Sequence, residues 1–233
     1  MNLNTAIKEL EKEKVLRTSL FKMTHEIKNP IAVCKGYLDM LDINNKKKVE
    51  KYIPIIKGEI ERTLNLMDDY LEYTKIKLNK DVADIYMLLD EVIDSLNLFF
   101  KENNIILEMN LPDDELFLDI DYNRIKQVLI NILKNSSEAY DKDKKKMIIK
   151  INTKKRKNYF ELSIEDNGIG MDRDALNQVT ELFFTTKQNG TGLGTSLSKE
   201  IIELHGGKMK YDSALGIGTK VIIDLPLIEK NAC

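Results

Sequence analysis

The chain has 233 residues, of which 42% are hydrophobic and 32% are charged, as in globular proteins with long solvated helices. Its 36 basic and 38 acidic side chains give a formal net charge of -2, so no positive excess favours nucleic acid or an anionic membrane as partner. The two cysteines, Cys34 and Cys233, are far apart in sequence, which favours a reducing, cytoplasmic setting. No apolar run approaches the ~20 residues of a membrane span.

The first 80 residues have the apolar spacing of two long helices. Apolar side chains recur at steps of three and four, which places them along one seam of each helix. The seam positions are Leu20, Met23, Ile27, Ile31, Cys34, Leu38 and Leu41, then Val49, Ile53, Ile56, Ile60, Leu64, Met67, Leu71, Thr74 and Leu78. The polar run Asp42–Lys48 between them predicts a short, solvated turn.

A single hairpin leaves such a seam half covered. Two hairpins that pair into a four-helix bundle bury it, so we expect a homodimer. A hairpin folded back on its own second domain is the alternative. The first domain is expected over residues 1–80 and the second over residues 81–233.

The second region mixes helices and strands. Helices are expected over residues 85–101, 121–140 and 195–204, the second with Asp121 as its N-cap. Alternating strands are expected near residues 105–111, 147–151, 160–164 and 221–225, with a turn at Gly206–Gly207. This order predicts an α/β sandwich, with helices on one face of a mostly antiparallel sheet, and an α+β chain as a whole.

One of the two histidines, His25, falls on the solvent side of the first helix. Pro30 lies inside the same helix, where it removes a backbone hydrogen bond and predicts a kink just beyond His25. Glu26 is adjacent and could accept a proton from the imidazole or hold its tautomer. An idle surface histidine is the ordinary alternative.

Two glycine-rich segments and one polar helix face indicate phosphate chemistry. Glu165–Met171 follows a strand pattern, and Gly190–Gly194 opens a helix, whose N–H groups suit phosphate oxygens. Lys187 lies just upstream as a point charge, and Asp166 could accept a hydrogen bond from an exocyclic amine such as that of adenine. A further helix presents Asn131, Lys134, Asn135 and Glu138 on one face. An amide oxygen there is a reasonable Mg²⁺ ligand beside ATP phosphates.

With these motifs in this order, the chain resembles the bacterial sensor histidine kinases of two-component systems. His25-Glu26-Ile27-Lys28-Asn29-Pro30 looks like the H-box, and the segment from Asn131 to Asn135 looks like the N-box. Asp166–Gly170, Leu182–Lys187 and Gly190–Gly194 look like the G1, F and G2 boxes. Within the family, the residues of these motifs are most similar to those of sporulation-type kinases.

The resemblance implies a dimerising phosphotransfer hairpin followed by a Bergerat-fold ATP-binding domain. It implies His25 as phosphoacceptor, Glu26 as the adjacent acid or base, Asn135 as Mg²⁺ ligand and Asp166 as the adenine-recognising group. The other implied site residues are Lys187 in catalysis and Asn131, Lys134, Gly168, Gly170, Thr186, Gly190, Gly192, Leu193, Gly194 and Thr219 in nucleotide binding. Related ATPases carry a water-activating carboxylate at the position of Asn131, so its absence suits transfer to histidine.

The same resemblance implies transfer from His25 to an aspartate of a response-regulator receiver domain. The spacing His25-Glu26-x-x-Asn29 also matches the pattern linked to regulator phosphatase activity, in which Asn29 would position a water. No sensor segment precedes the hairpin in this sequence, so we expect either a separate sensor protein or a longer receptor.

Two other functions stay open at this point. One is a dimeric phosphate relay that binds no ATP, and the other is a serine kinase of the same nucleotide fold. Four further residues have structural interpretations: His205 as a cation at a helix C-terminus, Phe183 and Phe184 as lid-anchoring core residues and Cys34 as a buried thiol.

Overall fold

The computed structural model describes residues 3–112, 115–140, 146–187 and 190–228. The chain divides into two compact units, which we describe in turn. The first comprises Met1–Ile76 and Glu181–Leu193, and the second comprises Lys77–Thr180 and Gly194–Cys233.

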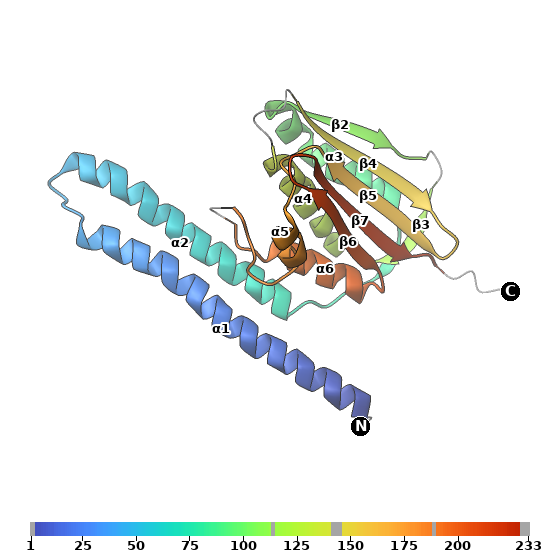
Figure 1. The fold of residues 1–233 in the computed structure, drawn as a ribbon, viewed down its shortest axis with the longest axis horizontal. Helices are drawn as coiled ribbons and strands as arrows, with labels where there is room; N and C mark the ends of the chain where they lie inside the picture. The colour runs from blue at the N-terminus through green and yellow to red at the C-terminus, as the bar shows by residue number, and fades with distance from the viewer. Residues whose placement is uncertain (1–2, 113–114, 141–145, 188–189, 229–233) are drawn as a thin grey trace. The chain divides into compact units, whose positions relative to one another are not determined.

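The first unit is built on a hairpin of two antiparallel helices, α1 (Leu3–Asp39) and α2 (Lys46–Thr74) (Figure 1). α1 continues as one helix across Pro30, and the kink expected just beyond His25 stays a prediction. The turn covers residues 40–45 in place of the expected 42–48. It ends at Asn45, which caps α2 and whose side chain accepts a hydrogen bond from the Lys48 N–H at 3.2 Å.

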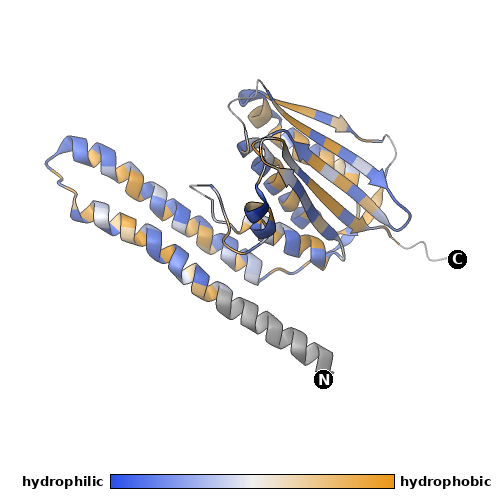
Figure 2. Ribbon diagram, viewed as in Figure 1, coloured by the Kyte–Doolittle hydropathy of each residue, from blue (hydrophilic) through white to orange (hydrophobic). Residues whose placement is uncertain are grey.

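The seam between the helices is only partly covered within one hairpin. Of the seam residues, Met23 and Ile56 are buried, whereas many others are largely exposed. The exposed seam residues are Leu20, Ile31, Leu38, Ile53, Ile60, Leu64, Met67 and Leu71. Cys34, expected to be buried, is half-buried, and its thiol donates to the Ile56 carbonyl oxygen at 3.6 Å. Hydrophobic residues therefore run along both helices with solvent beside them (Figure 2).

The second unit is a five-stranded sheet with the strand order β2-β4-β5-β7-β6. The strands are β2 (Ile105–Asn110), β4 (Met147–Lys155), β5 (Tyr159–Asp166), β6 (Lys208–Ala214) and β7 (Gly218–Pro226). β2 and β4 run parallel and every other neighbouring pair is antiparallel. The helices α3 (Ile85–Glu102), α4 (Tyr122–Glu138) and α6 (Gly194–Leu204) cover one face (Figure 1). The predicted sandwich is confirmed.

The core lies between these helices and the sheet. The five apolar residues expected on the inner face of α4 are all buried, and so are the alternating residues of β4 and β5. They are Ile125, Val128, Leu129, Ile132 and Leu133 on α4, Met147, Ile149 and Ile151 on β4, and Phe160, Leu162 and Ile164 on β5. Two expected core residues are instead exposed, Phe99 at the end of α3 and Met109 on the outer strand β2.

Three short elements did not emerge from the sequence pattern. β1 (Asp81–Asp84) and β3 (Phe117–Ile120) pair as a separate two-stranded antiparallel sheet, and α5 (Arg173–Gln178) follows the first glycine-rich segment. Each strand is four residues long and β1 is polar at both ends, so neither has an alternation long enough to recognise.

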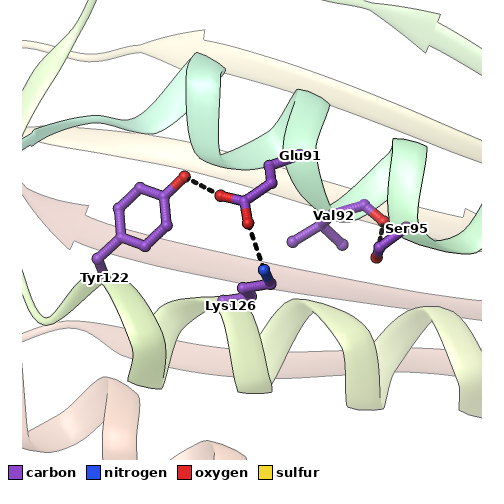
Figure 3. Close-up of polar contacts among 5 residues, drawn as sticks. All are labelled: Glu91, Val92, Ser95, Tyr122 and Lys126. Atoms are coloured by element: carbon purple, nitrogen blue, oxygen red, sulfur yellow. Dashed lines mark hydrogen bonds and ion pairs between the residues drawn. The ribbon is translucent and has the colours of Figure 1, made fainter.

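An exposed polar tie joins α3 to α4 (Figure 3). The Glu91 carboxylate contacts the Tyr122 hydroxyl and the Lys126 ammonium. The hydrogen bond from Lys126, followed by that from Tyr122, lowers the pKa of Glu91, and the same carboxylate raises the pKa of Tyr122 to about 12. The tie fixes the outer surfaces of the two helices, while their apolar faces contact the core.

His205 links the end of α6 to the start of α4. Its Nε2 accepts the Asp121 N–H at 2.9 Å, so Nδ1 carries the proton and donates to the Ile201 carbonyl oxygen at 2.7 Å. Burial lowers the pKa of His205, against the opposing effect of the Ile201 bond. The expectation of a cation at this helix end was wrong, because the ring is buried and both nitrogens are used by neutral hydrogen bonds. The expected glycine follows: Gly206 has a φ of 76°.

Candidate functional site

His25 is exposed on α1, as the helical pattern predicts. The only ring contact described for it is an edge-on approach to Phe21, one turn earlier, with the ring centroids 4.7 Å apart. Glu26 is half-buried and Asn29 is exposed one turn further along. An uncovered imidazole with an adjacent carboxylate can act as a nucleophile toward a group presented from solvent.

The Asp166 carboxylate is buried at the end of β5 and held in one orientation. Its Oδ1 accepts the N–H groups of Gly168 at 2.9 Å and Thr219 at 3.2 Å. Asp166 and Thr219 are directly opposite in the β5–β7 register. A Cβ on Gly168 would lie 2.4 Å from the Ala139 carbonyl oxygen, so only glycine allows the chain to turn there. The structure thus brings together three residues that the resemblance implies in nucleotide binding, Asp166, Gly168 and Thr219.

Ser213 on β6 supports this corner and was missed by the sequence analysis. Its hydroxyl lies 2.9 Å from the Thr219 hydroxyl and donates to the Gly218 carbonyl oxygen at 2.9 Å. It also accepts the Met171 N–H at 2.9 Å, just after the G1-like segment. Only the β6–β7 pairing reveals the residue, because no motif includes it.

The two asparagines of α4 form a hydrogen-bonded pair beside α6. Asn135 Nδ2 donates to Asn131 Oδ1 at 3.4 Å, and Asn131 Nδ2 donates to the Ser198 hydroxyl at 2.9 Å. Gly194 is the first residue of α6, and a Cβ there would lie 2.5 Å from Asn131 Oδ1. Lys134, expected beside the nucleotide, is exposed on α4.

The F-box-like residues and the G2-like residues up to Leu193 belong to the first unit, whereas Gly194 begins a part of the second. Phe183, at a φ of 67°, donates its N–H to the Gly192 carbonyl oxygen at 3.0 Å, and a Cβ on Gly192 would lie 2.4 Å from the Phe183 carbonyl carbon. A Cβ on Gly190 would lie 2.4 Å from the Thr185 hydroxyl. Thr186 and Lys187 are exposed.

This segment packs on the hairpin through apolar and polar contacts. Leu193 lies in a buried cluster with Met23, Leu66 and Tyr70, and Phe183 stacks on Tyr70 with ring centroids 6.3 Å apart. The expected role of Leu193 in nucleotide binding stays a prediction. The anchoring role expected for Phe183 agrees with this packing.

A carboxylate of the hairpin also bonds to this segment. The Thr191 hydroxyl donates to Asp69 at 2.7 Å. Burial raises the pKa of Asp69 despite that bond, and the nearby carboxylates of Glu72 and Asp68 raise it further. Asp69 is a second residue that the sequence analysis missed, because nothing in α2 marks it as different from other exposed acids.

The donor set suits a nucleotide carrying a hard metal ion. Buried Asp166 can accept from an exocyclic amine, the start of α6 offers backbone N–H groups, and the two amides of α4 offer oxygen atoms of the kind that Mg²⁺ prefers. Among the described residues, no group of three or more His, Cys, Asp or Glu could hold a metal ion by itself. In the same part of the chain, none of the helices combines the length and the apolar character needed to span a bilayer.

Comparison with known proteins agrees with this geometry. Residues 17–79 match the His Kinase A (phospho-acceptor) domain, and residues 120–229 match the histidine kinase-, DNA gyrase B- and HSP90-like ATPase family. The chain therefore belongs to the bacterial two-component sensor histidine kinases, with an ATP-binding domain of that ATPase family.

Individual relatives are similar over most of this chain. Sporulation kinase E of Bacillus subtilis is 31% identical over 99% of this chain and 33% of its own length. Sensor protein DegM of Bacillus sp. is 30% identical over 90% of this chain and 54% of its own length. The chain thus spans between a third and about half of these relatives. The histidine kinase ThkA, solved in complex with the response regulator protein TrrA, is 28% identical with a TM-score of 0.77, over 97% of this chain and 66% of that chain.

Proposed function

We propose that this chain is an ATP-dependent protein histidine kinase that phosphorylates His25 and passes the phosphoryl group to an aspartate of a receiver domain. The observation that carries the proposal is the exposed His25, followed by Glu26, inside the matched phosphoacceptor domain. The ATPase-family match over residues 120–229 supports ATP as the phosphoryl donor. The domain limits proposed are 1–80 for phosphotransfer and 81–233 for ATP binding.

The chain's own residues supply positioning and proton transfer. A ring nitrogen of His25 attacks the terminal phosphorus, the new N–P bond replaces the bond to the bridging oxygen, and ADP leaves. Glu26 accepts the proton that the imidazole loses. Asp166, Gly168 and Thr219 orient the adenine, while Lys187 and the N–H groups at the start of α6 offset phosphate charge. Mg²⁺, when bound through Asn135 with Asn131 beside it, supplies further charge neutralisation.

The remaining nucleotide residues have backbone roles in this proposal. Gly170 has a φ of 66° and a Cβ there would lie 2.0 Å from the Ala214 carbonyl oxygen, so it lets the G1-like turn approach β6. Gly190 and Gly192 shape the segment that covers the phosphates. Thr186 precedes these two glycines in the chain, and Leu193 follows them.

Partners follow from the surface and from the relatives. The exposed seam of α1 and α2 supports a homodimer, because a second hairpin would cover it. The ThkA complex with TrrA supports a response-regulator partner. We place the reaction in the cytoplasm, where ATP is available, with the input signal supplied by a separate sensor protein or another part of a longer chain.

The test is incubation of the purified chain with γ-labelled ATP and Mg²⁺, beside a His25→Gln variant. Acid-labile label on the parent alone is the expected result, because phosphohistidine is hydrolysed by acid. Label that survives acid, or that persists in His25→Gln, would reject the assignment and favour a serine kinase of the same fold. Failure to bind nucleotide would favour a relay protein.

Regulator phosphatase activity is a second candidate, favoured by the exposure of Asn29 one turn from His25. In this role the Asn29 amide would orient a water toward the phosphoaspartate of the receiver. Asn29→Ala should then slow loss of label from a phosphorylated receiver domain while leaving autophosphorylation measurable. Equal rates for parent and variant would remove this activity.

A further inference from the structure

Ser198 lies on the inner side of α6 and is only 2% exposed. Its hydroxyl donates to the Gly194 carbonyl oxygen, one turn earlier, at 2.8 Å. The same oxygen lies 2.9 Å from Asn131 Nδ2 on the neighbouring helix α4. Ser198 is thus the one described side chain that bonds both to the first residue of α6 and to the N-box asparagine.

The proton count fixes the orientation of the Asn131 amide. A serine hydroxyl has one proton, and here the carbonyl oxygen of Gly194 takes it. The Asn131 atom facing Ser198 must therefore be a donor, which only the NH₂ group can be. Asn131 Oδ1 is consequently turned toward Asn135 and toward Gly194, at the start of α6.

The orientation of the Asn131 amide in turn determines the orientation of the Asn135 amide. Because Asn131 presents an oxygen, Asn135 faces it with its Nδ2, at 3.4 Å, and turns its own Oδ1 away from Asn131. A flipped Asn131 would present NH₂ instead and would draw the Asn135 oxygen inward. An NH₂ group cannot ligate a cation, so each flip would remove an oxygen from the metal side.

We propose that Ser198 is a positioning residue, which sets both amides of α4 so that their oxygens serve the metal-bearing phosphates. This inference rests on the proposed function, since it takes Asn131 and Asn135 as the residues that meet Mg-ATP. In this role Ser198 bonds to Asn131 and to the Gly194 carbonyl oxygen and needs no contact with the metal or the nucleotide. It acts through Asn131, so its effect must disappear when Asn131 is removed.

The experiment measures the affinity of the full chain for a non-hydrolysable ATP analogue, by calorimetry, with Mg²⁺ and again with a chelator. Ser198→Ala should weaken binding about tenfold with Mg²⁺, equivalent to about 1.4 kcal/mol, and should leave the chelator value within about twofold. In an Asn131→Ala background, Ser198→Ala should have no further effect.

Two matched comparisons separate orientation from packing. Ser198→Thr and Ser198→Val have the same shape, but only threonine keeps the hydroxyl, so Val should lose about tenfold in Mg²⁺-dependent affinity relative to Thr. The comparison of the Thr and Val variants also tests the proposal if Ser198→Ala does not fold. Ser137→Ala is the control, because the buried Ser137 hydroxyl makes the same bond to a carbonyl one turn earlier, Leu133 at 2.6 Å, away from Asn131.

These measurements can support or overturn the positioning role of Ser198. Equal losses with and without Mg²⁺, equal affinities for the Thr and Val variants, or an additive effect in the Asn131→Ala background would each overturn the positioning role. If Asn131→Ala weakens Mg²⁺-dependent binding and Ser198→Ala does not, only this inference fails. If the parent chain binds no nucleotide, the proposed function fails with it.

Discussion

At the scale of single residues, His205 lies outside every motif, yet its hydrogen bonds hold together the two helices that carry site residues. Its ring accepts the N–H of Asp121, the residue that caps α4, while its other nitrogen donates to α6. The helix that carries Asn131 and the helix that begins at Gly194 are therefore joined at their far ends. Protonation of the ring would remove the acceptor that Asp121 needs.

We therefore predict that stability falls as pH drops below about 6.5. Burial lowers the pKa of His205, so the unfolded chain takes up the proton first and stability is lost between the unfolded and folded pKa values as pH falls. Urea unfolding followed by circular dichroism at several pH values measures this. His205→Gln keeps an acceptor but not the titration, so its slope over this range should be flatter. An unchanged slope would contradict the assignment, since both proteins retain His25.

Gly194 also affects the site as a single residue, because its lack of a side chain leaves room for the Asn131 amide. A Cβ there would lie 2.5 Å from Asn131 Oδ1, well inside van der Waals contact, so Gly194→Ala must displace the asparagine. We expect at least a tenfold loss of affinity for an ATP analogue with Mg²⁺.

The matched control is Gly58→Ala in α2, where a Cβ would meet nothing within 4 Å. That change should leave nucleotide affinity unaltered and stabilise the hairpin by about 0.5–1 kcal/mol, because alanine restricts the unfolded chain and favours helix. Equal affinities for the Gly194→Ala and Gly58→Ala variants would show that the close approach to Asn131 is not needed for binding.

At the scale of elements, the start of α4 determines where its asparagines lie. The two oxygens of Asp121 accept different N–H groups, Arg124 in the first turn at 3.1 Å and Asn79 at 2.7 Å. Burial raises the pKa of Asp121, but these hydrogen bonds outweigh that effect and the net pKa is lowered. The carboxylate therefore joins the chain just after the hairpin to the helix of the N-box.

Loss of this cap should cost the second unit about 1–2 kcal/mol. Asp121→Ala removes both accepted bonds, whereas Asp172→Ala removes only the cap of the six-residue helix α5, on an exposed part of the surface. Chemical denaturation of the three proteins at neutral pH compares them. A cost for Asp121→Ala no larger than that for Asp172→Ala would mean that the bond to Asn79 adds nothing.

Among the helices and strands, the sequence can predict features that depend on local patterns but not contacts between distant segments. α4 was predictable because its cap, its apolar face and its polar face are all local patterns. The role of Ser198 was not, since its partner Asn131 lies 67 residues earlier and only the packing of α6 on α4 brings them together. The packing of Leu193 was not predictable for the same reason, because a glycine motif does not reveal that the leucine within it packs on Tyr70.

At the scale of the whole molecule, the exposed seam of the hairpin predicts the oligomeric state. Leu64 is 55% exposed in the middle of α2, on a surface that apolar residues share along both helices. A glutamate there would have to be buried if a second hairpin covered it, at a large cost in desolvation. Leu64→Glu should therefore convert a dimer into a monomer in sedimentation experiments.

Leu215 provides the matched control, since it is 70% exposed in the second unit, outside the hairpin. Leu215→Glu should leave the mass of the assembly unchanged. A parent chain that sediments as a monomer at micromolar concentration would contradict the paired hairpins and favour a hairpin covered in some other way.

The order of the strands has a last consequence, for behaviour at high concentration. β6 ends the sheet, and an end strand offers unpaired backbone groups to which a strand of another molecule can add. Lys208, Lys210 and Asp212 are exposed in alternation along it, and Lys210 lies 3.8 Å from Asp224 on β7. Each strand added at this border would bring these solvated charges against a neighbour. The border strand thus helps keep a protein with much exposed apolar surface from aggregating through its sheet.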